Sequence, residues 1–81
     1  MFTIYCYNVG GRKFDRYFRS WERAKEELEK ELKNLLKDSW TQLAHSDYFN
    51  AAKGFYVFGY TLKTTDGETA VLSLIDGYFI D

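Results

Sequence analysis

The segment SWERAKEELEKELKNLLKDSW, Ser20 to Trp40, decides the fold of this chain. Its apolar residues recur every three or four positions, a spacing that lines one face of an α-helix. The remaining positions are mostly Glu, Lys and Arg, so the helix is predicted to be half buried, with one stripe that needs a partner surface. The residues of this stripe are Trp21, Ala24, Leu28, Leu32, Leu35, Leu36 and Trp40.

Ser20 predicts where the helix begins, because its hydroxyl can accept a hydrogen bond from a free amide of the first turn. The pattern supports a helix to about Asp38 and leaves open an extension to Leu43.

Alternating and aromatic segments on both sides of the helix predict the partner surface. Gly10 and Gly11 supply a turn in the first pair, and Thr65-Asp66-Gly67 supplies one in the second. The predicted strands are Phe2–Val9, Lys13–Phe18, Gly54–Lys63 and Thr69–Ile75. Residues 41–53 are read as either a short second helix at 46–52 or a structured loop.

These elements predict an α+β domain. Four strands in the order ββαββ form an antiparallel sheet, and one long amphipathic helix packs on one of its faces. Eighty-one residues leave no room for a second core, so residues 1–81 are expected to form a single compact domain.

Composition and charge narrow the function classes. Eleven basic and 12 acidic residues give a formal net charge of -1, which supplies no field to attract a polyanion, so nucleic acid is an unfavoured partner. Cys6 is the one cysteine and cannot form an internal disulfide, which indicates a reducing compartment, the cytoplasm. No apolar segment predicts a membrane span or a signal peptide.

No residue pattern predicts an enzyme. His45, Ser46 and Asp47 are neighbours in the chain, whereas a nucleophile and its base must converge through space. A single histidine provides no two-histidine metal set. We therefore expect no catalytic, metal or cofactor site and no small-molecule substrate. Cys6 alternates in phase with Phe2 and Ile4 and is read as a buried, unreactive core residue with a raised pKa.

The tyrosines are the candidate contact residues. If Phe2, Ile4 and Cys6 face the helix, Tyr5 and Tyr7 lie on the open face of the sheet. Tyrosine suits such a surface because its ring is apolar and its tip is polar. Tyr56 and Tyr60 share a parity, but the sequence does not decide their face.

Arginines complete the predicted surface, with Arg16 and Arg19 at its rim. The cluster Arg12, Lys13, Arg16 and Arg19 surrounds the first hairpin and the start of the helix. It is interpreted as protection of an exposed hairpin against edge-to-edge pairing, and a local anion-contacting edge is the other reading.

We predict a non-enzymatic intracellular protein that acts by docking to a larger protein partner or by self-association, including as a homodimer. The alternative function is binding of single-stranded nucleic acid, with the same tyrosines stacking on bases. A purely structural reading, in which the aromatic face is simply covered, also stays open. In its size and in its lack of an enzyme motif the chain is similar to phage-encoded inhibitors of host machinery, including anti-CRISPR proteins. This likeness of class implies action through a protein partner.

Overall fold

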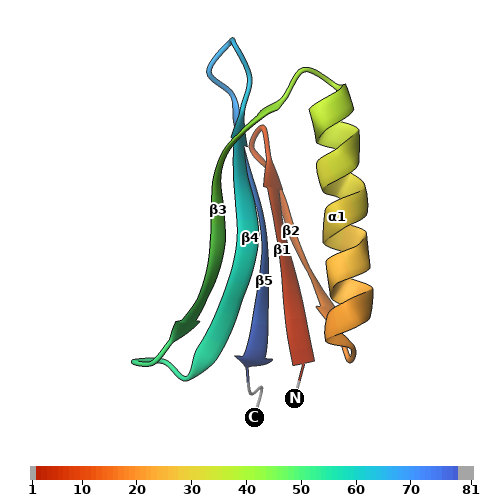
Figure 1. Ribbon diagram of the computed structural model, residues 1–81. Coiled ribbons are helices and arrows are strands. Elements are labelled where there is room, and N and C mark those ends of the chain that lie inside the picture. Colours follow the sequence, from red (N-terminus) through yellow and green to blue (C-terminus); the bar gives the residue numbers. More distant parts are fainter. Residues whose placement is uncertain (1, 79–81) are drawn as a thin grey trace.

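The chain forms a pair of strands, a helix and three further strands, as the computed structural model describes them for residues 2–78 (Figure 1). The five strands make one antiparallel sheet in the order β2-β1-β5-β4-β3. The elements are β1 (Phe2–Val9), β2 (Arg12–Phe18), α1 (Trp21–Lys37), β3 (Thr41–Asn50), β4 (Phe55–Lys63) and β5 (Thr69–Tyr78). The predicted α+β class is confirmed, whereas the predicted count of four strands is wrong.

The additional strand is β3, where the sequence predicted a short helix at 46–52 or a loop. β3 pairs with β4 from Thr41 opposite Lys63 to Asn50 opposite Phe55. Gly54, with a φ of 75°, helps the chain to turn between the two strands. The weak helical pattern of this segment is outweighed by the long ladder that it forms with a strongly β-forming neighbour.

The helix begins as the sequence predicts. The Ser20 hydroxyl accepts a hydrogen bond from the Arg23 amide at 3.4 Å. The helix ends at Lys37, so the extension to Leu43 is wrong. Ser39 adopts a φ of 71° and turns the chain away from the helix into β3.

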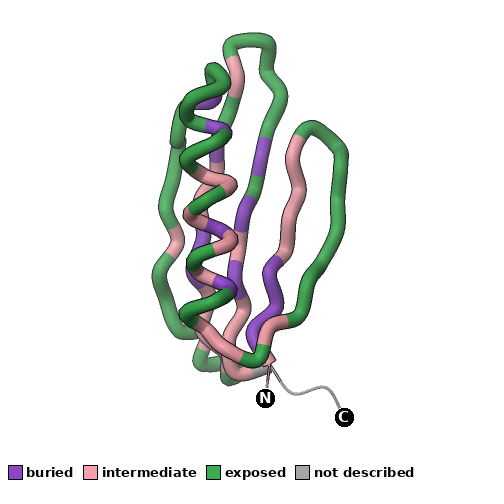
Figure 2. Tube along the Cα trace, turned by 90° about the vertical axis from the view of Figure 1, so that its right-hand side faces the viewer, coloured by how far each residue is buried: buried purple, intermediate pink, exposed green. Residues whose placement is uncertain are grey.

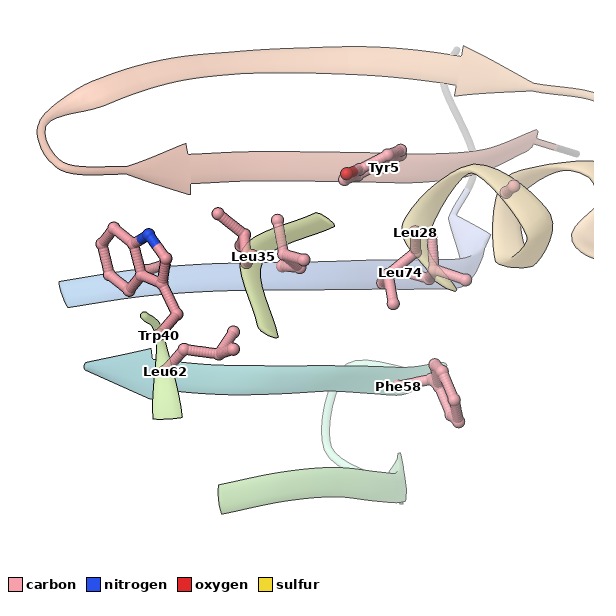
Figure 3. Packing of buried hydrophobic residues seen from close by; sticks show 10 residues of the cluster. Tyr5, Leu28, Leu35, Trp40, Phe58, Leu62 and Leu74 are labelled. Carbon is pink, nitrogen blue, oxygen red and sulfur yellow. The ribbon is translucent and has the colours of Figure 1, made fainter. Parts of the chain in front are cut away.

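The core lies between α1 and the sheet, where the buried positions gather (Figure 2). Leu28 of the helix packs with Leu62 of β4 and Leu74 of β5 there (Figure 3). Leu28, Leu62, Leu72 and Leu74 are fully excluded from solvent. Burying each such side chain contributes about 1.5–3 kcal/mol. In contrast, β2 and β3 are exposed along nearly their whole length.

The faces of β1 are the reverse of the prediction. Tyr5 and Tyr7 pack in or against the helix-covered core. Phe2, Ile4 and Cys6 therefore lie on the helix-free face, because side chains alternate along a strand. The pairing of β1 with β5 explains this orientation.

Tyr5 lies opposite Leu74 and Tyr7 opposite Leu72, so these tyrosines share a face with the leucines that pack under the helix. The alternation within β1 separates two sets of residues but does not show which set the helix covers.

Candidate functional site

β3 is an open edge of the sheet. It pairs with β4 on one side only, and it lies at the far end of the sheet from β2 (Figure 1). Three large apolar side chains of β3 are exposed, with exposed fractions of 59% for Leu43, 51% for Tyr48 and 61% for Phe49. Among residues 2–78, no strand pairs with the backbone groups that point away from β4, so β3 can accept a further strand.

The two edges of the sheet carry opposite chemistry. β2 has four charged residues among seven, and lysine or arginine on an edge discourages pairing with another chain. β3 has ten residues and contains no lysine, arginine or proline; its one carboxylate is Asp47. A register shift between Gln42 and Ala44 disturbs the beginning of the strand. The regular part of the free edge is therefore 44–50.

β3 is anchored to the sheet beyond its backbone ladder. Nδ1 of His45 lies 2.9 Å from the carbonyl oxygen of Gly59, and the imidazole stacks on the Tyr60 ring at 4.5 Å between centroids. Burial, with the nearby carboxylates of Glu29 and Asp47, raises the pKa of Tyr60. These contacts hold the strand in register while its outer edge stays open.

A row of apolar side chains crosses the helix-free face and ends at β3. Each member lies opposite the next on the neighbouring strand, and the row consists of Tyr17, Ile4, Ile75, Val57 and Tyr48. Ile4 is only 7% exposed although no helix covers it, because its neighbours in the row shield it. Tyr17 and Tyr48 are the two exposed ends, on opposite edges of the sheet.

The adjacent row on the same face is small and polar. It contains Asp15, Cys6, Ser73, Gly59 and Ser46. Burial, together with the charge and hydrogen bonding of Asp15, raises the pKa of the Cys6 thiol to about 11. The thiol is therefore almost entirely protonated near neutral pH and unreactive as a nucleophile. The raised pKa of Cys6 agrees with the prediction. The predicted location of Cys6 beneath the helix is wrong, because the residue lies on the helix-free face.

The predicted contact tyrosines all lie on the helix side of the sheet. Tyr5 is 4% exposed and belongs to the core. Tyr7, Tyr56 and Tyr60 are partly buried against that core. The prediction that Tyr5 and Tyr7 form part of an uncovered aromatic face is wrong, because the helix covers the face that carries them. Stacking on nucleic-acid bases would need rings with free faces, which the buried Tyr5 ring does not provide.

The structure separates the predicted residues into four places. Tyr5, Tyr7 and Arg16 meet in a groove between α1 and the first hairpin. On the other flank of the helix, Tyr56 contacts Trp21 at 5.6 Å between ring centroids. The remaining residues lie elsewhere: Tyr60 is beneath His45, and the Arg19 guanidinium lies 5.8 Å from the centre of the Phe2 ring.

Leu43, Tyr48 and Phe49 were missed because residues 41–53 were not recognised as a strand. The signal that could have found them is local. Asp47, Tyr48 and Phe49 lie six to eight residues before the strongly β-forming segment FYVFGYTL, with Gly54 between. An aromatic pair that precedes a turn and another strand is typical of a hairpin.

His45, Ser46 and Asp47 do not converge. Side chains alternate along a strand, so His45 and Asp47 lie on the helix side and Ser46 lies on the helix-free face. Within residues 2–78, no group of three or more His, Cys, Asp and Glu residues is placed to hold a metal ion. No helix in the same range has both the length and the apolar character needed to cross a membrane.

The sequence matches no protein-family model, and comparison with curated proteins and with solved structures likewise gives no match.

Proposed function

We propose that this protein acts by binding a protein partner, which adds an extended segment as a sixth strand along the outer edge of β3. The observation that carries the proposal is the contrast between the two sheet edges. The β2 edge is charged, whereas β3 offers a long, nearly uncharged edge with exposed Tyr48 and Phe49. Strand addition uses the unpaired backbone for affinity and alternate side chains for specificity.

The side chains of β3 indicate what the partner segment contains. Asp47 is exposed and makes no ion pair with the residues that the structure describes, so a basic residue opposite it would be favoured. Apolar residues opposite Tyr48 and Phe49 would cover the exposed rings. The residue opposite Tyr48 would also extend the apolar row of the helix-free face by one strand.

The proposed location of this activity is the cytoplasm. It rests on Cys6, which is the one cysteine of the chain and carries a free thiol. Small domains that work outside the cell usually depend on disulfides, which this chain cannot form internally.

We expect Tyr48→Lys to weaken partner capture about tenfold or more, because loss of an aromatic hot spot costs about 2 kcal/mol or more and a tenfold change corresponds to about 1.4 kcal/mol. The added lysine also places a charge on an edge that would have to be desolvated on pairing. The measurement is affinity capture from the source cell, with quantification of each retained protein. Tyr17→Lys is the matched control, because Tyr17 has a similar exposed fraction (56%) at the opposite end of the same row.

A partner that Tyr17→Lys retains and Tyr48→Lys loses supports the proposal. Equal capture by wild type and Tyr48→Lys contradicts it. Light scattering of the purified protein tests whether a second copy of this chain occupies the edge instead. A dimer that dissociates in Tyr48→Lys would assign the edge to that second copy. Salt-sensitive binding of labelled single strands would instead favour the nucleic-acid alternative.

A further inference from the structure

A groove of about 220 Å³ lies between α1 and the β1–β2 hairpin, on the opposite side of the molecule from β3. Tyr7 and Phe14 stack along its wall at 4.4 Å between ring centroids. The helix contributes carboxylates to the other wall. The full lining is Tyr5, Tyr7, Phe14, Arg16, Glu27, Lys30, Glu31 and Asn34.

Tyr5 lines this groove, and its hydroxyl has no hydrogen-bond partner among the residues that the structure describes. The residue is 96% buried, since its exposed fraction is 4%. None of the side-chain hydrogen bonds within residues 2–78 involves it. No fully buried polar side-chain atom in that range lacks a partner, so the oxygen keeps some access to solvent. Burial raises the pKa of Tyr5, as do the groove residues Glu31, Tyr7 and Glu27, whereas Arg16 acts in the opposite direction.

Glu31 is a carboxylate without a compensating charge. Residues three or four positions away are neighbours on a helix, and for Glu31 these are Glu27, Leu28, Asn34 and Leu35. Every other glutamate of α1 has a lysine or arginine at such a spacing. Glu31 is also half buried and makes no ion pair with the described residues. Among these four neighbours Glu27 is the one charged residue, and its like charge repels Glu31.

Neither basic residue of the groove lining, Arg16 or Lys30, forms an ion pair with Glu31. The Arg16 guanidinium lies 3.6 Å from Glu27 and over the Phe18 ring, 5.1 Å from its centre. Lys30 is exposed and follows Glu29 directly before Glu31, and adjacent residues on a helix do not face each other. Among the described residues, the groove therefore combines a carboxylate without an ion pair, a phenol oxygen without a hydrogen bond and an aromatic wall.

We propose that this groove binds a primary ammonium group at the end of an alkyl chain, the chemistry of a lysine side chain or of a free alkylamine. The ammonium donates hydrogen bonds to the Glu31 carboxylate and the Tyr5 oxygen, while its alkyl chain lies against Tyr7 and Phe14. The hydrogen bond between the ammonium and the Glu31 carboxylate is strong because both groups are charged and the groove is partly shielded from solvent. A water molecule occupies about 30 Å³, so a groove of about 220 Å³ has room for several water molecules or for an alkyl chain that displaces them.

The test is titration of the purified protein with N-acetyl-lysine methylamide, followed by the NMR signals of Tyr5, Tyr7 and Phe14. We expect saturable shifts with a dissociation constant of about 1–10 mM, because the probe is small and the groove open. Glu31→Gln should weaken binding about fivefold or more, and Tyr5→Phe about threefold. Glu26→Gln is the matched control, an exposed glutamate of the same helix outside this groove, and should change affinity less than about twofold.

The neutral Nε-acetylated form of the probe should not saturate. Equal binding of the charged and neutral forms, no saturable shift for wild type, or an unchanged affinity in Glu31→Gln would each overturn the proposal. Backbone amide spectra of the variants separate loss of binding from loss of fold. Pentylamine distinguishes the sources: tighter binding than the lysine probe identifies a free amine, and weaker binding identifies a side chain of a protein.

Discussion

Gly59→Ala is expected to destabilise the fold by about 3 kcal/mol or more, because the added methyl group would collide with backbone rather than with a movable side chain. A Cβ at this position would overlap the Leu72 carbonyl oxygen and lie 2.9 Å from the Ser73 Cα. β4 and β5 would have to separate at the centre of the sheet. The Gly59 carbonyl oxygen also lies within hydrogen-bond distance of Nδ1 of His45. A shift of β4 would therefore weaken one of the contacts that hold β3 to the sheet.

Urea denaturation followed by the fluorescence of Trp21 and Trp40 measures this effect. For a domain of this size, 3 kcal/mol corresponds to a fall in Tm of about 12–24 °C. Gly11→Ala is the control, because a Cβ there meets nothing within 4 Å and only its φ of 85° is unfavourable. It should cost about 1–2 kcal/mol. A Gly59→Ala variant as stable as wild type would contradict the packing of β4 against β5.

Leu28→Ala is expected to cost about 3–4 kcal/mol, within the usual range for removing a fully buried leucine. Leu28 is 0% exposed and lies at the centre of the contact between α1 and the sheet. The substitution leaves a cavity in the one apolar layer that the described residues provide. Since small domains are stable by about 5–15 kcal/mol, the variant should lose a large part of its stability.

Leu36→Ala is the matched control on the same helix. The sequence placed Leu36 in the apolar stripe, but its side chain is 45% exposed. Its truncation should therefore cost less than about 1 kcal/mol, as measured by the same denaturation curves. Equal losses for the two variants would mean that the helix is rotated relative to the sheet.

The helix and four of the strands could be predicted because each carries its own local signal. Leu28 and its stripe repeat at helical spacing, and Ser20 marks the beginning of the helix. The segments around Phe58 and Leu72 are rich in β-forming residues and flank a glycine turn. These signals depend on neighbours in the chain, which a sequence displays directly.

β3 and the face of β1 could not be predicted because both depend on contacts between distant segments. His45 and Tyr48 become strand residues through pairing with β4, and their own propensities are mixed. Tyr5 faces the helix because its neighbour Leu74 does, and that neighbour is 69 positions away. The same error affected the candidate surface. With the faces reversed, the predicted tyrosines lie on the helix side of the sheet. The exposed rings of Tyr48 and Phe49 lie on a strand that was not recognised.

Edge protection connects the fold to the proposed function. The charges of β2 were read from the sequence as protection against edge-to-edge pairing, and β2 is indeed an edge strand. β3 is the other edge and has no such protection. In a sheet with one edge protected, an unprotected one is a favourable place for a specific partner strand.

Amide hydrogen exchange of the protein bound to its captured partner tests the strand-addition claim most directly. We expect amides of residues 44–50 to exchange more slowly in the complex, since those pointing away from β4 gain hydrogen bonds, while the amides of β2 are unchanged. Slower exchange confined to β2 or to the outer face of α1, with 44–50 unaltered, would contradict it.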